Sequence, residues 1–374
     1  MLSLGERERR IKAIREKMAE RSIDVLLVAS NSDLTEIGKV RYVSYWPIVL
    51  FDGYIVVPQK GEIIYFGHYG LDAELAKRHF LINQTYATPF GENPGPHLAK
   101  LVKGFSPRRI GLCGTRGLGA DVYRAFMEDI GGGGIAVEDA TDIVETLRMV
   151  KSAEELSCIE KAAALADFAM DHFKKSLKPG RVERDLVYEI DYEIKKRGAE
   201  NAFYFIGSGK IPAITFPVFV AKRKIEHGDL VVFNIELVGE EGYCTQIIRF
   251  FSVGKPAAEI LEAHTILNAS LEAGRKELSH GNGMSNVAGA ILTVIKENGY
   301  SIGLHMGHGQ GLDMMERPFP TTDDKTVLKS DMAITLHPQL VLPGGLGLFI
   351  ANQYVVTGKG GRCLNKTPNE IMVV

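Results

Sequence analysis

The sequence predicts two domains, an α/β domain followed by an α+β domain. The chain has 374 residues, about two to three times the length of a typical domain. As far as about residue 140, short apolar runs typical of strands alternate with helical windows, the pattern of an α/β domain. A capping box formed by Ser152 and Glu155 then opens a new helix. We therefore place the domains at residues 1–147 and 148–374.

The elements of the first domain follow from the spacing of apolar residues. Ile11, Ile14 and Met18 recur at helical spacing in a charged background, which predicts an amphipathic helix over residues 6–21. A short strand is expected at 25–28. Two apolar runs at 54–57 and 63–66 enclose a turn-rich segment, which predicts a hairpin. Another strand is expected at 110–113.

The second domain begins with two helices and continues with strands. The helix that starts after Ser152 is expected to end near Lys178-Pro179-Gly180, and a second helix is expected over 183–197. Apolar runs at 230–237 and 243–253 predict a long hairpin. Helices are then expected at 257–278 and 285–298, and final strands at 333–342 and 347–357.

Composition excludes several classes of protein. The residues are 45% hydrophobic and 24% charged, as in ordinary globular domains. A net charge of -2 gives no general attraction for nucleic acid or an anionic membrane. The four cysteines lie far apart, and no apolar stretch approaches the roughly 20 residues that span a bilayer. These features predict a cytoplasmic protein without nucleic-acid or membrane partners.

Glycine-rich segments do not indicate a nucleotide cofactor. Residues 114–117, 131–134 and 207–210 contain glycines, but none of them matches a GxGxxG or P-loop pattern in the required context. We interpret these glycines as turn residues.

Several phrases of the second half resemble a known family. They are the segment 147–152 (Leu-Arg-Met-Val-Lys-Ser), Gly228-Asp229, Gly242-Tyr243 with Arg249, the segment 307–313 (Gly-His-Gly-Gln-Gly-Leu-Asp), and Val355-Val356-Thr357. Their order and spacing resemble the family of creatinase, prolidase, aminopeptidase P and methionine aminopeptidase over most of residues 148–374. The resemblance implies a creatinase-type N-terminal α/β domain and a pita-bread α+β domain.

The resemblance also shows where a metal site is missing. Metal-dependent members hold two divalent ions with two aspartates, a histidine and two glutamates. The corresponding positions here are Asn234, Gln246, His308, His337 and Ala351, so only the histidine is kept. Carboxylates neutralise a pair of ions about 3.5–4 Å apart, and neutral amides do not. We therefore expect no metal and no cofactor.

Two further family positions have changed. The Pro-His phrase becomes Thr215-Phe216, and the histidine of a His-Glu pair becomes Met315, which leaves Glu316 alone. Creatinase is a metal-free member, but it keeps the Pro-His imidazole and uses the two glutamates to hold a guanidinium group. The resemblance therefore does not imply creatine hydrolysis.

The lost acids change the expected charge of the site. With no metal to balance, the site becomes neutral or mildly basic, which favours a neutral or anionic small-molecule ligand. We expect His308, His337 and Arg249 to gather around such a ligand, with Glu316 or a histidine transferring protons. The predicted catalytic residues are His308, Glu316 and His337, and the predicted ligand-binding residues are Arg249, Gln246, Asn234, Glu236 and Phe216.

Three functions remain open. The first is a metal-independent hydrolase or lyase of a small polar metabolite, and the second is a catalytically silent binding or scaffold protein. The third is an Xaa-Pro dipeptidase or aminopeptidase with a rebuilt single-ion site on His308, His337 and Glu236. Glu236, however, lies about 6.5 Å farther along the strand than Asn234. Ordinary structural roles also stay open for each of these residues, such as an ion pair for Arg249.

The resemblance implies a homodimer. In this family the N-terminal domain commonly mediates dimerisation and places residues over the pocket of the partner subunit. Arg41, Tyr42 and Trp46 lie in the similar segment here, with ordinary packing as the alternative.

Overall fold

The chain forms two compact units, Met1–Arg148 and Met149–Val374. A computed structural model describes residues 2–48, 51–67, 70–80, 82–131, 134–212, 216–303, 305–342 and 347–374. That the chain folds as two independent domains with a boundary after residue 147 stays a prediction. Limited proteolysis would test it.

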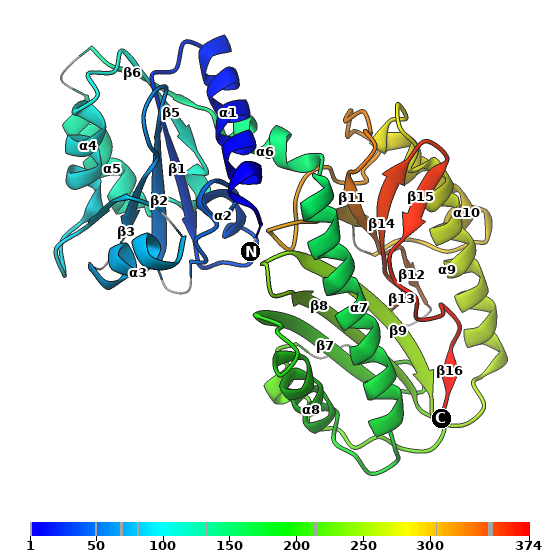
Figure 1. Cartoon of the computed structure of the whole chain (residues 1–374). Helices are drawn as coiled ribbons and strands as arrows, with labels where there is room; N and C mark the ends of the chain where they lie inside the picture. Colours follow the sequence, from blue (N-terminus) through cyan, green and yellow to red (C-terminus); the bar gives the residue numbers. More distant parts are fainter. Residues whose placement is uncertain are drawn as a thin grey trace. The chain divides into compact units, whose positions relative to one another are not determined.

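The first unit is a six-stranded sheet flanked by helices (Figure 1). The strands lie in the order β4-β3-β2-β1-β5-β6, and β2 is antiparallel to both β1 and β3. The pairs β1–β5, β3–β4 and β5–β6 are parallel. The strands are β1 Val25–Asn31, β2 Asp52–Pro58, β3 Ile64–Gly67, β4 Gln84–Ala87, β5 Arg109–Cys113 and β6 Ala136–Asp139.

The helices of this unit pack on the apolar faces of the sheet. Leu98 and Val102 of α4 and Val122 and Phe126 of α5 join the sheet residues in one buried core. The helices are α1 Leu4–Glu20, α2 Gly38–Ser44, α3 Gly70–Phe80, α4 Pro94–Lys103, α5 Ala120–Ile130 and α6 Thr141–Met149, the last of which ends at the border of the two units. The α/β pattern predicted from the sequence is confirmed.

The second unit contains two four-stranded sheets and a small hairpin. One sheet has the order β16-β9-β8-β7 and the other the order β10-β11-β14-β15, while β12 and β13 pair with each other. An isolated bridge between Ile248 and Ala351 joins the two larger sheets. The strands are β7 Asn201–Gly209, β8 Leu230–Val238, β9 Cys244–Ser252, β10 Gly307–Gly309, β11 Ala333–Leu336, β12 Gln339–Val341, β13 Gly347–Phe349, β14 Asn352–Thr357, β15 Gly360–Cys363 and β16 Met372–Val373.

Two pairs of helices cover these sheets. Figure 1 shows α7 (Ala153–Ser176) lying across β8 and β9, and residues of α7 and α8 (Glu183–Lys195) share one core with β8 and β9. Residues of α9 (Ala258–Glu277) and α10 (Met284–Glu297) form another core with β11 and β14. Ser152 caps α7 in the predicted capping box with Glu155. No helix in the described ranges is both long and apolar enough to cross a membrane.

Strand β8 is buried on both faces, and the two faces differ in chemistry. Val231, Phe233, Ile235 and Leu237 all belong to the core beneath α7 and α8. The alternate residues begin as apolar, with Leu230 and Val232 in the other core, and end as polar, with Asn234 and Glu236. Because side chains alternate along a strand, this second face carries the polar residues of the candidate site.

The final strands differ from the sequence prediction. The runs expected at 333–342 and 347–357 are each divided in two, as β11 with β12 and β13 with β14. Pro338 follows His337 at the first break, and a proline has no N–H group to continue a ladder. The strands β7, β10, β15 and β16 were not predicted. Three of these are short or glycine-rich, so their apolar pattern is weak.

Candidate functional site

The sheet registers bring most of the altered family positions together. On β8, Asn234 lies opposite Ile248 of β9, and Ile248 forms the bridge to Ala351. Leu336 lies opposite Asn352, so continuing that register by one residue sets His337 opposite Ala351. The candidate site therefore lies where the two larger sheets of the second unit meet.

Three polar side chains of β8 and β9 form a hydrogen-bonded ladder. The Nε2 atom of Gln246 donates to Asn234 Oδ1 at 3.1 Å and to Glu236 Oε1 at 3.0 Å. All three side chains are at most 9% exposed. Burial raises the pKa of Glu236 to about 8, because the charged form loses its hydration. At neutral pH this carboxyl group is therefore mostly protonated.

Two amide atoms of this ladder have no hydrogen-bond partner among the described residues. They are Asn234 Nδ2, a donor, and Gln246 Oε1, an acceptor. Buried polar atoms in native proteins are nearly always satisfied, so each exception requires an explanation. A bound polar molecule that accepts from Asn234 and donates to Gln246 would supply both missing bonds.

Two predicted histidines meet a third, unpredicted one. The ring centroids of His308 and His337 lie 5.3 Å apart, and His305 lies 4.7 Å from His337 and 6.0 Å from His308. His308 Nδ1 lies 3.0 Å from the Gly309 carbonyl oxygen; an N–H on Nδ1 that donates there leaves the Nε2 lone pair free. Burial lowers the pKa of His308 to about 4 and that of His337 well below its ordinary value. Both imidazoles are neutral at pH 7.

A second set of buried amides continues the polar layer. His308, Thr335 and Gln353 lie side by side in the register of β10, β11 and β14. Gln310 Oε1 accepts from Thr335 Oγ1 at 2.7 Å and from Gln353 Nε2 at 3.0 Å. Gln353 Nε2 also donates to the carbonyl of Cys244 at 3.1 Å, two residues before Gln246. A continuous layer of neutral polar groups thus connects the two sheets.

Aromatic rings lie beside the polar ladder. In the register of β7 and β8, Phe203 is opposite Glu236 and Phe205 is opposite Asn234, so each ring shares a sheet face with its polar partner. The ring of Phe205 packs against Phe349 with centroids 5.0 Å apart. We call the rings of Phe203, Phe205 and Phe349 the aromatic wall. An apolar wall next to a few polar groups is the usual composition of a small-molecule site.

Arg249 does not join this group, contrary to our expectation. It is fully buried and donates to the carbonyls of Ile248, Ala351 and Thr367 and to Asn352 Oδ1, at 2.7–2.8 Å. Gln246 and Arg249 are three residues apart on one strand, so their side chains leave opposite faces. The guanidinium group holds the chain segments around β9 together.

Glu316 is also occupied by structural bonds. Its Oε2 lies 2.9 Å from Lys151 Nζ, and its Oε1 accepts from the N–H groups of Leu312 and Asp313 at 2.8 and 3.1 Å. Both charged side chains are at most 2% exposed. This ion pair fixes the turn that follows the strand of His308, and the geometry does not support Glu316 as a proton-transfer group.

Phe216 lies at the edge of the aromatic wall. Its side chain is 61% exposed, and its ring packs 4.9 Å from the ring of Phe203. Thr215, the neighbouring altered position, lies outside the described residues.

The three N-terminal residues singled out by the resemblance are buried in their own unit. Arg41, Tyr42 and Trp46 are 8%, 1% and 8% exposed. The guanidinium of Arg10 packs 4.3 Å from the centre of the Tyr42 ring, and Trp46 contacts the rings of Tyr65 and Phe80. The contacts within this unit correspond to ordinary packing.

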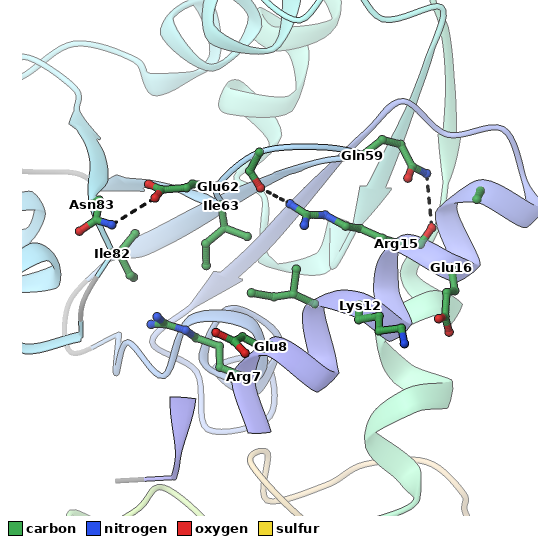
Figure 2. Close-up of a pocket in the computed structure, with 13 residues that line it drawn as sticks. Arg7, Glu8, Lys12, Arg15, Glu16, Gln59, Glu62, Ile63, Ile82 and Asn83 are labelled. Atoms are coloured by element: carbon green, nitrogen blue, oxygen red, sulfur yellow. Dashed lines mark hydrogen bonds between the residues drawn. The ribbon is translucent and has the colours of Figure 1, made fainter. Parts of the chain in front are cut away.

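A hollow of about 640 Å³ lies in the first unit, between α1 and the β2–β3 hairpin. Figure 2 shows Arg15 of α1 reaching towards this hairpin, where it donates to the carbonyls of Pro58 and Gly61. Glu62 accepts from Asn83 at 3.2 Å. The acidic and basic side chains that line this hollow are equal in number, and several are already hydrogen-bonded. The hollow therefore offers no concentrated charge or reactive group.

The side chains of the candidate site do not fit a two-ion centre. Asn234 and Gln246 supply neutral oxygens, and Ala351 supplies none. In the described parts of the chain, no three histidine, cysteine, aspartate or glutamate side chains are placed to hold a metal ion together. The single-ion set of His308, His337 and Glu236 is therefore not assembled either. We assign no catalytic step to a metal.

Sequence reasoning missed His305 and the aromatic wall. The alternation of Phe203 and Phe205 within a nine-residue strand was the available signal, since such residues share one face. His305 precedes its strand in an irregular segment, and no periodic pattern points to it.

Comparison with known proteins identifies the class of this two-unit architecture. Residues 10–150 match the creatinase/prolidase N-terminal domain, and residues 157–358 match metallopeptidase family M24. The chain belongs to metallopeptidase family M24. An Xaa-Pro dipeptidase of Pyrococcus horikoshii is 28% identical over 369 residues, covering 97% of this chain and 98% of the relative.

Solved structures agree with this assignment. The prolidase of Pyrococcus horikoshii OT3 superposes with a TM-score of 0.84 at 26% identity, over 97% of this chain and 100% of the other. An X-Pro aminopeptidase of Thermotoga maritima gives a TM-score of 0.85 at 22% identity, over 97% and 99% of the two chains, and shows the fold alone. The predicted α/β domain followed by a pita-bread domain is confirmed.

Proposed function

We propose that this chain binds and hydrolyses small dipeptides of the Xaa-Pro type without a two-ion centre. Its membership of family M24 and the full-length relative named Xaa-Pro dipeptidase support this proposal. They favour the peptidase alternative over the metal-independent lyase that was part of our main expectation from the sequence.

The placement of the aromatic wall beside the polar ladder carries the proposal. Phe203 and Phe205 lie opposite Glu236 and Asn234 in one sheet register. An Xaa-Pro dipeptide has an apolar pyrrolidine ring next to a tertiary amide, whose carbonyl oxygen accepts hydrogen bonds but which has no N–H to donate. Its free ammonium group is the hydrogen-bond donor. The ring matches the aromatic wall, and the polar atoms match the unpartnered amide atoms of Asn234 and Gln246.

His308 is the group we propose for proton transfer. Its free Nε2 accepts a proton from water as the water oxygen bonds to the peptide carbonyl carbon. When the C–N bond breaks, the imidazolium returns this proton to the proline nitrogen, so the products are a free amino acid and proline. The pKa of His308 is about 4, which makes it a weak base, and we expect slow turnover.

The test measures binding and proline release separately. Purified protein is titrated calorimetrically with alanyl-proline and leucyl-proline, and free proline is assayed over hours, before and after chelator treatment and with added divalent metals. We expect saturable binding, slow release that survives chelation, and at least tenfold weaker binding in Phe205→Leu. Phe219→Ala is the control, since Phe219 is 61% exposed and lies outside the aromatic contacts described. Absence of binding to wild-type protein would overturn the proposal.

A silent binding protein is the second candidate, because four of five family ligands are lost. Binding without proline release, under all metal conditions, would favour it. Release that depends on one added ion per chain would instead favour a single-ion peptidase.

We also propose a cytoplasmic homodimer. None of the four cysteines, all of which lie in the described ranges, forms a disulfide, and three of them are buried, as in a reducing compartment. Analytical ultracentrifugation tests the dimer, and a single species at the mass of one chain would contradict it.

A further inference from the structure

One buried carboxyl group of the candidate site lacks a cation. Glu236 is 9% exposed, and one of its oxygens accepts from Gln246. Within the described residues it makes no ion pair, and the neighbouring strands place Phe203 and Gln246 opposite it. Neither of these two side chains carries charge. Burial is the whole cause of its raised pKa.

The neighbouring amide atoms define which groups fit next to this carboxyl. Gln246 Oε1 is an acceptor without a donor, and Asn234 Nδ2 is a donor without an acceptor. Asn234 and Gln246 are themselves nine-tenths or more buried. The ladder therefore offers two acceptors, from Glu236 and Gln246, and one donor from Asn234.

We infer that Glu236 and Gln246 bind the free amino group of the ligand, while Asn234 donates to the adjacent carbonyl oxygen. This inference rests on the proposed function and names the residues that recognise the amino end of the dipeptide. A free amino terminus is an ammonium group followed by a carbonyl group one carbon away. The ammonium group supplies donors for Glu236 and Gln246, and the carbonyl oxygen supplies the acceptor for Asn234.

The electrostatics support this arrangement. An ammonium group that leaves water requires an anionic or strongly polar partner, and a buried carboxylate requires a cation. The pKa of Glu236 lies near 8, close enough to neutral pH that an arriving cation favours the ionised form. A ligand whose amino group is acylated has no ammonium charge to pair with Glu236, and the acyl group adds bulk at the same point.

The experiment compares two probes on three proteins. Alanyl-proline and N-acetyl-alanyl-proline are titrated calorimetrically into wild-type protein, Glu236→Gln and the control Glu240→Gln. Glu240 lies on the exposed turn between β8 and β9. We expect wild-type protein and the control to bind the free-amine probe at least tenfold tighter than the acetylated probe. In Glu236→Gln the two affinities should lie within about threefold, with the acetylated probe unchanged.

The outcomes separate this inference from the proposed function. Equal affinity of wild-type protein for both probes would overturn the role of Glu236 while leaving the proposed function in place. A retained preference in Glu236→Gln would do the same. If neither probe binds wild-type protein, the proposed function itself fails. The wild-type comparison does not depend on the folding of a variant, and thermal denaturation checks that Glu236→Gln is folded.

Discussion

Two buried glutamates of the second unit have opposite surroundings. Glu316, after β10, contacts Lys151 at 2.9 Å and accepts two backbone N–H bonds. Glu236, on β8, accepts one bond from Gln246 and contacts no cation in the described ranges. Both are at most 9% exposed, so burial alone does not distinguish them.

The difference lies in what each carboxyl group still needs. Both carboxylate oxygens of Glu316 contact partners from its own chain, which makes it part of the framework. Glu236 keeps capacity for a cation and stands next to unsatisfied amide atoms. A buried ionisable group without a partner lowers stability, and a site that binds ligand is a reason to keep it.

The largest predicted effect comes from breaking the satisfied pair. Lys151→Met removes the cation that faces Glu316 Oε2 and leaves a buried carboxylate that has lost its lysine. Loss of one partner of a buried pair costs about 3–5 kcal/mol. We expect a decrease of this size in the free energy of unfolding, measured by urea denaturation. Lys325→Met is the control, because Lys325 is exposed; equal effects of the two variants would remove the distinction between the glutamates.

Much of the fold could be predicted from the sequence because its signals are local. The capping box at Ser152, the apolar runs of β8 and β9, and the helical spacing along α9 each depend on residues close together in the chain. Strands of three or four residues, such as β10 and β15, carry too few positions to show a pattern.

The candidate site was harder to predict because it depends on faces and partners. Asn234, Gln246, His308 and His337 could be located by resemblance, and the structure places them near the meeting of the sheets. The odd separation of Gln246 and Arg249 already indicated opposite faces of one strand. By contrast, the pairing of Glu316 with Lys151 spans 165 residues, and no local pattern reveals it.

The buried carboxyl of Glu236 makes the stability of the protein depend on pH. The pKa of Glu236 is about 8 in the folded protein, against about 4.3 in an unfolded chain. Between these values the folded state holds more protons, so stability falls as pH rises, by up to about 1.4 kcal/mol per pH unit. Glu236→Gln removes this dependence. We expect the variant to gain stability over wild-type protein from pH 5 to pH 8, measured by thermal denaturation across that range, with Glu240→Gln following wild-type protein.

A third buried glutamate, Glu155, gives the smallest predicted effect. It extends the comparison of Glu316 and Glu236 to another buried carboxyl group. Glu155 is 1% exposed and accepts from Ser152 N at 2.8 Å and from the Tyr243 hydroxyl at 2.9 Å. Tyr243→Phe removes one of these bonds while keeping the ring, and a hydrogen bond to a charged group contributes about 1.5–3 kcal/mol. Because Glu155 keeps its capping bond, we expect a loss at the lower end of this range, about 1.5–2 kcal/mol, in urea denaturation. A loss as large as that of Lys151→Met would mean that one hydrogen bond to a buried carboxylate contributes as much here as the lysine of the Glu316 pair, which would contradict the ranking of these effects.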